Sequence, residues 1–353
     1  MFLISFLLTW TVSQVGAVEV PTLYTAQVGL DQELPNPREA AYLAALGQVL
    51  LCVAGPELAA DAATRELLFP NPQALVVQFR PGQDDTLWVS FDGDAIERTL
   101  REAGETVWGR DRPLTLVWLA VDWGQGEREI IGADDPERTI DAARSIDRNR
   151  LLRQRILDMA ERRGLPVVFP LLDTDDLQMV SFSDIWGGFD DQLLEASQRY
   201  DSSSILVGRI RPESSERNRW TYYFADEAQT LNGEPELVMN LVADHLAAEF
   251  AIRGSEPLES IELRIAGVDS VAAYGSVQRL LAELPVVESF LIRTVNGDEI
   301  AYRVQARGGA ERLRRALRFN GLVEQDRFVI DDFSTGGFEA PLEFFYGPDP
   351  AQP

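Results

Sequence analysis

Aspartate clusters are the residues of this chain whose type and spacing could do chemistry. The run Asp173-Thr174-Asp175-Asp176 follows an apolar stretch, and an aspartate that ends a buried strand can attack phosphorus in phosphoryl transfer. A lysine helps to hold the phosphate in that chemistry, and all 32 basic residues of this chain are arginines. The pairs Asp134-Asp135 and Asp190-Asp191 carry oxygen ligands suited to a divalent cation, but neither lies in an EF-hand pattern. Adjacent aspartates commonly form turns and caps, so we predict no catalytic residue and no metal site.

Tryptophan–glycine turns next to predicted central strands are stronger candidates for a binding site. The candidate interaction loops contain eight residues, namely Trp108, Gly109, Asp122, Trp123, Asp184, Trp186, Gly187 and Gly188. The alternative is structural, since an indole packs well over a sheet edge and glycine permits positive φ. Convergence of these side chains on one concave pocket would favour a ligand-binding or enzymatic role. Side chains scattered over separate places would instead favour a protein that acts without catalysis.

Several chemical classes are excluded by composition. Without lysine there is no P-loop lysine and no Schiff base. The chain has one histidine, His245, and one cysteine, Cys52, so multi-histidine zinc sites and internal disulfides are also excluded. We therefore predict no cofactor. The formal net charge of −25 argues against nucleic-acid binding, which needs a basic face to neutralise phosphates.

An export signal is predicted at the N-terminus. Phe2 to Trp10 is apolar, and Val15-Gly16-Ala17 has the small-residue pattern of a signal-peptidase site. The apolar stretch is too short to span a bilayer. We expect residues 1–17 to be a signal peptide cleaved near Ala17, which gives a periplasmic protein with no membrane span in the mature chain. The alternative is a buried N-terminal strand.

The elements that would position the candidate residues centre on Phe182 to Ile210. This stretch predicts a loop around Trp186, a helix capped by Asp190 and a buried strand from Ser204 to Ile210. The other elements predicted for a central α/β domain, residues 114–252, are strands at Leu114–Val121, Leu165–Leu172 and Trp220–Phe224 and helices at Pro136–Arg163 and Glu234–Ile252.

Two further domains flank this one, so the predicted fold class is α/β and α+β with three small domains. Residues 18–103 predict an N-terminal α+β domain with a strand, a helix from Pro37, a helix over 58–68, a hairpin over 74–91 and a last helix to Ala103. Residues 258–330 predict the order β-α-β-β-α-β of the ferredoxin-like motif, with its hairpin at Asn296-Gly297. The acidic tail, residues 331–353, is expected to be flexible.

The stretches GETVWGRDRPLTLVWLAVDWG, LPVVFPLLDTDDLQMVSFSDIWGGFDD and SSSILVGRI followed by RWTYYF resemble the family called domain of unknown function 2066. That family consists of envelope-targeted proteins of Gram-negative proteobacteria, and its name implies no known activity. Together these observations predict a non-enzymatic periplasmic adaptor or assembly factor for a cell-envelope complex, with a protein partner in the envelope. The alternative is a small-ligand-binding protein or an enzyme that uses the tryptophan, glycine and aspartate loops of the central domain. The oligomeric state is not predicted.

Overall fold

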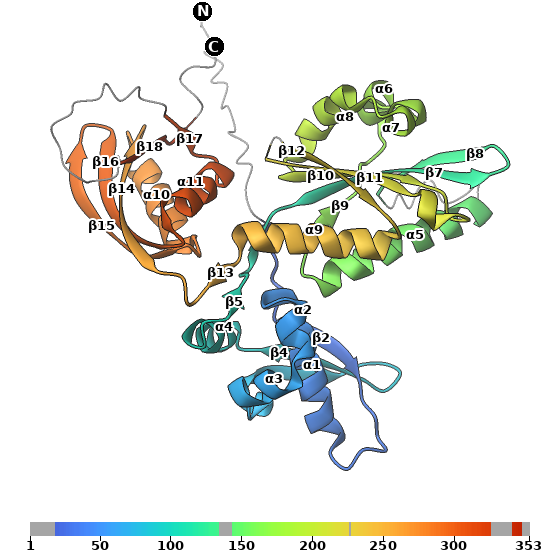
Figure 1. Ribbon diagram of the computed structural model, residues 1–353, viewed down its shortest axis with the longest axis horizontal. Coiled ribbons are helices and arrows are strands. Elements are labelled where there is room, and N and C mark those ends of the chain that lie inside the picture. Colours follow the sequence, from blue (N-terminus) through green and yellow to red (C-terminus); the bar gives the residue numbers. More distant parts are fainter. Residues whose placement is uncertain (1–17, 134–142, 226, 326–340, 348–353) are drawn as a thin grey trace, which may run out of the picture. The chain divides into compact units, whose positions relative to one another are not determined.

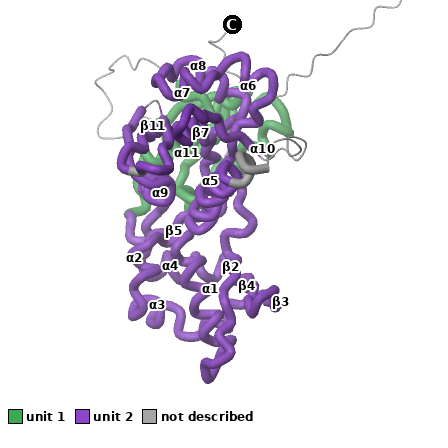
Figure 2. Tube along the Cα trace, turned by 90° about the vertical axis from the view of Figure 1, so that its right-hand side faces the viewer, with its two compact units in different colours: residues 1–16, 257–353 green, residues 17–256 purple. Residues whose placement is uncertain are grey.

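The computed structural model describes residues 18–133, 143–225, 227–325 and 341–347 (Figure 1). The predicted signal peptide and the pair Asp134-Asp135 lie outside these residues. The chain divides into two compact units, residues 17–256 and residues 257–353, which Figure 2 colours separately. The predicted N-terminal and central domains therefore fall within one unit, although each has a hydrophobic core of its own.

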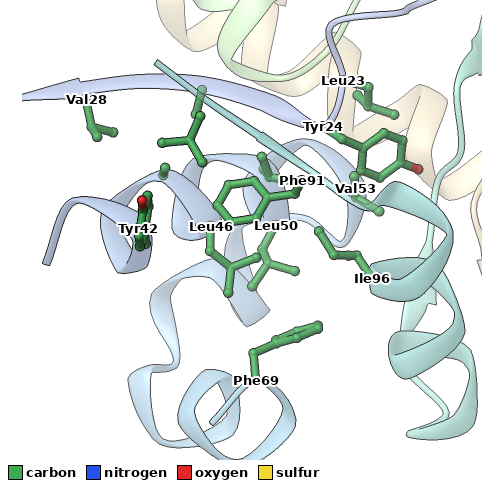
Figure 3. Close-up of a cluster of buried hydrophobic side chains, with 14 of the residues drawn as sticks. Leu23, Tyr24, Val28, Tyr42, Leu46, Leu50, Val53, Phe69, Phe91 and Ile96 are labelled. Carbon is green, nitrogen blue, oxygen red and sulfur yellow. The ribbon is translucent and has the colours of Figure 1, made fainter. Parts of the chain in front are cut away.

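The N-terminal part packs one long helix against a three-stranded antiparallel sheet of order β2-β4-β3. Its elements are β1 (Val18–Glu19), β2 (Thr25–Gly29), α1 (Pro37–Val53), α2 (Pro56–Ala60), α3 (Ala62–Leu68), a 3₁₀ turn (Pro72–Leu75), β3 (Val76–Pro81), β4 (Thr86–Phe91) and α4 (Gly93–Glu102). Tyr42, Leu46 and Leu50 lie on one face of α1 and meet Val28 and Phe91 of the sheet (Figure 3). Alternating apolar residues in the strands and an apolar stripe on the helix produce this core.

The single helix predicted over residues 58–68 is wrong in detail. It is two helices, α2 and α3, because Asp61 adopts an extended conformation between them and caps the second. Its side chain accepts hydrogen bonds from the backbone N–H groups of Ala63 and Thr64, as an N-cap residue does. The capping signal, an aspartate followed by the good helix formers Ala62 and Ala63, was present in the sequence.

The central part is a six-stranded mixed sheet in which β7 and β10 run parallel side by side. Its strands are β7 (Thr115–Gly124), β8 (Glu127–Ile131), β9 (Val167–Val168), β10 (Ser204–Ile210), β11 (Arg219–Phe224) and β12 (Glu227–Asn232). The order is β12-β11-β10-β7-β8, and β9 pairs with the start of β7. The strand predicted at Leu165–Leu172 is therefore reduced to two residues, and β12 was missed because its sequence, EAQTLN, is polar and exposed.

Both faces of the central sheet are covered by helices (Figure 1). These helices are α5 (Ala143–Arg162), α6 (Thr174–Met179), α7 (Phe182–Gly187), α8 (Asp190–Ser197) and α9 (Pro235–Phe250), with 3₁₀ turns at Gln198–Tyr200 and Ser215–Arg217. Val117 and Leu119 of β7 pack with α5 and α9, and Leu116 and Trp118 pack with α7 and α8 on the other face. The continuous apolar run of β7 is typical of a strand that is buried on both sides. Three two-residue strands complete this unit, β5 (Thr106–Val107), β6 (Asp111–Arg112) and β13 (Ile252–Arg253).

The loop predicted around Trp186 is wrong, because Phe182–Gly187 is helical. Ser181 and Asp184 form a capping box at its start, and Gly188 ends it in the left-handed conformation with φ of 75°. Asp190 was predicted as the N-cap of the next helix and is its first residue instead. Phe189 occupies the N-cap position without a side-chain hydrogen bond.

The C-terminal unit is a five-stranded mixed sheet with two helices. Its elements are β14 (Leu258–Ala266), α10 (Val271–Glu283), β15 (Val287–Asn296), β16 (Glu299–Arg307), α11 (Gly309–Phe319), β17 (Val323–Glu324) and β18 (Leu342–Phe345). From β14 to β17 they follow the predicted order. The segment predicted as a flexible tail supplies β18, which lies parallel to β14 and antiparallel to β17. Leu342 and Phe344 of β18 are buried, and burial of these two apolar side chains explains why this part of the tail is ordered.

Candidate functional site

Aromatic and arginine side chains gather at the carboxyl ends of β7 and β10, the edge of a parallel sheet pair where binding sites commonly form. The capping box fixes the start of α7, so Phe182 and Trp186 are four residues apart on one helical face. Their rings stack with centres 5.1 Å apart at an angle of 22°. Both side chains are half-buried and pack against the core between α7, α8 and the sheet.

Two arginines extend this stack at its ends. The guanidinium of Arg211, directly after β10, lies 4.5 Å from the centre of the Trp186 ring. Arg128 of β8 lies 5.9 Å from the ring of Phe182 and forms an ion pair with Asp122 at 3.4 Å. Within the described part of the chain, no carboxylate lies within ion-pair distance of Arg211. Arg211 therefore presents an uncompensated positive charge beside an indole.

The two glycines after Trp186 have separate roles. A Cβ atom on Gly187 would lie 2.5 Å from the Phe189 ring, so this ring rests on the Gly187 backbone. Gly188 has positive φ, and a Cβ there would lie 3.3 Å from the guanidinium of Arg209. Phe189 itself is 64% exposed. We call Arg128, Phe182, Trp186, Phe189 and Arg211 together the aromatic–arginine surface.

The carboxylates nearest to this surface are engaged within the protein. Asp184 accepts hydrogen bonds from the hydroxyl and backbone N–H of Ser181, and these bonds lower the pKa of Asp184. Asp122 accepts from the backbone of Gly124 at 3.1 Å, besides its ion pair. Asp190 accepts a hydrogen bond from the Tyr223 hydroxyl. Each of the three carboxylates therefore accepts at least one hydrogen bond from the protein itself.

Trp108 and Gly109, two of the predicted residues, lie elsewhere and have a structural role. The guanidinium of Arg112 lies 3.7 Å from the centre of the buried Trp108 ring. The guanidinium donates hydrogen bonds to four carbonyl oxygens. The acceptors are those of Trp108 and Gly109 at 2.7 Å, Cys52 at 2.9 Å and Arg163 at 3.3 Å. Arg112 thus links α1 to the end of α5.

Trp123 also does not join the aromatic–arginine surface. Its indole packs on the other face of the sheet, with the core beneath α5 and α9. Arg148 of α5 lies 4.5 Å from the centre of the Trp123 ring and pairs with Glu127 and Glu129 of β8. The structure therefore brings Asp122, Asp184, Trp186, Gly187 and Gly188 together and leaves Trp108, Gly109 and Trp123 apart.

The aspartate cluster at residues 173–176 is an internal ion-pair network. Asp173 caps α6 and accepts hydrogen bonds from both terminal nitrogens of Arg199 at 2.8 Å. This pairing lowers the pKa of Asp173 to about 2. Asp176 is buried and bonds to Arg199, the Tyr200 hydroxyl and the backbone of Leu172. The sequence favours turns and caps for these aspartates, and Asp173 is such a cap, but Asp176 is enclosed because these partners satisfy its oxygens.

A cavity of about 410 Å³ lies between the β1–β2 segment, Cys52 of α1 and the α5–β9 connection. Glu19 and Glu161 contribute its charged groups, and none of the eight predicted residues lines it. Burial raises the pKa of the Cys52 thiol to about 11, which keeps it protonated and unreactive at neutral pH. Among the described residues, no group of three or more histidine, cysteine, aspartate or glutamate side chains could hold a metal ion.

Sequence reasoning missed four residues of this surface, Arg128, Phe182, Phe189 and Arg211. The pattern Ser181-x-x-Asp184 signals a helix start, and it would have placed Phe182 on the same face as Trp186. Arg211 follows the last apolar residue of β10, a position that favours the carboxyl edge of the sheet. No short-range signal places Arg128 there, because its position depends on the pairing of β8 with β7.

Comparison with protein-family models matches residues 17–109 to a domain of unknown function (DUF8605). The matched segment is the N-terminal three-stranded sheet with its helices. The resemblance to the family of domain of unknown function 2066 is therefore wrong. The stretches that suggested it lie mostly beyond residue 109. A search of curated proteins finds no match to this chain. Within the described residues, no helix combines the length and apolarity needed to cross a membrane.

Proposed function

We propose that this protein is a non-enzymatic periplasmic adaptor or assembly factor for a cell-envelope complex, and that it binds its protein partner through the aromatic–arginine surface. One observation carries the proposal. Arg211 stacks on the half-buried Trp186 and has no carboxylate partner among the described residues. Tryptophan and arginine are the side chains most enriched where protein interfaces derive their binding energy.

The surface favours a partner segment that carries a carboxylate. A guanidinium binds a carboxylate with two parallel hydrogen bonds, and the ring of Trp186 offers apolar area beside the guanidinium of Arg211. Since Trp186 is already partly packed against the core, the platform is fixed before binding. A fixed platform lowers the entropy lost when a partner binds.

Binding without catalysis is supported by the state of the nearby carboxylates. Asp122, Asp184 and Asp190 each accept a hydrogen bond from a neighbouring residue, which is the arrangement of carboxylates that serve the protein's own structure. The alternative, a small-ligand-binding or enzymatic role, draws support only from the closeness of these aspartates to Trp186. That role would need a concave site lined by the predicted residues.

The periplasmic location rests on the export signal predicted at residues 1–17. Intact-mass measurement of protein from a periplasmic extract should give a chain that begins at Val18. A chain that retains Met1 and stays in the cytoplasm would remove this part of the proposal. We further propose that residues 18–103, 114–252 and 258–330 are three domains, of which the last is a ferredoxin-like unit with β18 inserted beside its first strand.

Site-specific photo-crosslinking tests the binding role. A photoreactive phenylalanine analogue replaces Phe189, which is 64% exposed, and the matched control carries it at Leu67 of α3, which is 78% exposed. We expect a discrete covalent adduct from position 189 in cells and none from position 67. Equal labelling at both positions, or no adduct at 189, would contradict the proposal.

A further inference from the structure

The strand β15 forms an edge of the C-terminal sheet and is ten residues long. Among the described strands it pairs only with β16. Half of its backbone N–H and C=O groups therefore face outward, where they can pair with another strand. It also exposes apolar side chains, since Leu291 is 70% exposed and Val295 is 62% exposed.

Three other sheet edges in the described structure carry features that discourage pairing. β17 has two residues, β12 is polar, and β3 contains a bulge and ends at Pro81. Short strands, bulges and prolines are the means by which natural sheets protect their edges. β15 contains two bulges, but the segment Ser289–Ile292 between them is regular and contains no charged residue. This segment is the unprotected part of the edge.

The sequence of this segment is complementary to itself in the antiparallel direction. A two-fold axis at Leu291 would place Leu291 opposite its own copy and Phe290 opposite Ile292 of the second chain. In this register Glu288 lies opposite Thr294 and Arg293 lies opposite Ser289 of the second chain, so no like charges face each other. A parallel arrangement would bring like charges together and is disfavoured.

We propose that β15 pairs with β15 of a second copy of this chain, so that the two C-terminal sheets form one continuous sheet across a symmetric dimer. In each copy Leu291 lies opposite Arg303, whose ion pair with Glu262 marks the open face of the sheet. Phe290 and Ile292 lie opposite the buried residues Val304 and Tyr302 on the helix-covered face. The pairing therefore buries apolar side chains on both faces.

The dimer is expected to be weak and to depend on salt. Pairing of one short segment buries less area than a standard interface of about 1,600 Å². Each copy also carries a net charge of −25, so the two copies repel each other at low ionic strength. Added salt screens this repulsion, and dimerisation should strengthen as salt is raised.

Sedimentation equilibrium of the purified protein tests this proposal with a charge swap at Leu291. The wild type should shift from monomer to dimer as concentration rises, more readily in high salt. Leu291→Arg and Leu291→Glu should each weaken dimerisation at least ~tenfold, because like charges would then face each other at the axis. An equimolar mixture of the two variants should dimerise again. Val271→Arg, at a residue 88% exposed on α10 of the same unit, is the matched control and should behave as the wild type.

Each other outcome overturns the proposal. A wild type that stays monomeric at all concentrations and salt levels has no such interface. If the Leu291→Arg variant dimerises as strongly as the wild type, the dimer forms through another surface. A mixture of the two charged variants that stays monomeric shows that Leu291 does not face its own copy. Aggregation beyond the dimer shows that the edge pairs without a two-fold axis.

Discussion

The guanidinium of Arg112 lies 3.7 Å from the centre of the Trp108 ring, and both side chains are buried. The four carbonyl oxygens that accept its hydrogen bonds come from α1, from the loop at Trp108 and from the end of α5. This contact is one of those that join the N-terminal and central parts within one compact unit. It also removes Trp108 from the residues available to a partner.

Arg112→Lys should therefore destabilise the protein strongly. A lysine cannot reach four carbonyls in one plane or stack on the indole as a guanidinium does. Buried acceptors left without a donor cost ~1–3 kcal/mol each, so we expect a loss of at least ~3 kcal/mol in urea unfolding. Arg110→Lys is the control, because Arg110 is exposed and stacks on Tyr24 at 4.9 Å. Equal midpoints for the two variants would show that the Arg112 network has little influence on stability.

Gly187 and Gly188 should respond differently to alanine. Gly188 has φ of 75°, so Gly188→Ala places a side chain in the left-handed region and should cost ~1–3 kcal/mol. Gly187→Ala meets only the exposed Phe189 ring, which can move aside, and should change stability by less than ~0.5 kcal/mol. The Gly187 variant should instead weaken partner capture, because Phe189 is displaced. Thermal melts and crosslinking yield measure the two effects, and a reversed order in stability would contradict these roles.

Trp186→Ala should cause a moderate loss of stability of about 2 kcal/mol, because the indole is half-buried. Trp118→Ala is the comparison, since Trp118 is fully buried and donates its indole N–H to Ser197 at 2.9 Å. A buried tryptophan of this kind should cost ~3–5 kcal/mol. Chemical unfolding of both variants decides the matter. Equal losses would mean that Trp186 serves the core alone, and no loss at Trp186 would mean that its packing contributes nothing.

The ion pair of Asp173 with Arg199 predicts acid sensitivity. The pKa of Asp173 is lowered from 3.8 to about 2 in the folded state, so its contribution to stability is complete above pH 3.8 and is lost as the pH falls towards 2. Asp173→Asn should lower the melting temperature at pH 6 and converge with the wild type near pH 2. Asp175→Asn, in the same helical turn, is the control. A difference between wild type and Asp173→Asn that stays constant from pH 6 to pH 2 would contradict this assignment.

The elements with strong hydrophobic periodicity were predicted correctly from the sequence. The helix from Pro37 is α1, and the apolar run at Leu114–Val121 is the central strand β7. In both cases burial follows the local pattern, so no distant contact is needed to see it. The hairpin at Asn296-Gly297 joins β15 and β16 as its turn signal indicates.

The wrong predictions have a common physical cause. In each case the structure of the segment depends on residues far away in the sequence. β18 is short and is ordered through its pairing with β14, about 80 positions earlier in the sequence. Asp176 is buried because Arg199 and Tyr200 reach it from the far end of α8. The position of Arg128 beside Phe182 likewise depends on strand pairing. Trp186, by contrast, was found from its local pattern, although its helix was mistaken for a loop.

The effect of Arg211 on the crosslink from position 189 tests the central claim most directly. In cells that carry the photoreactive residue at 189, Arg211→Ala should reduce the yield of the partner adduct at least ~tenfold, because the guanidinium that binds the partner carboxylate is gone. Arg80→Ala is the control, since Arg80 also stacks on a tryptophan, Trp88, at 4.3 Å but lies in the N-terminal sheet. It should leave the yield unchanged. An adduct whose yield survives Arg211→Ala, in protein that melts like the wild type, would contradict the claim that the aromatic–arginine surface binds the partner.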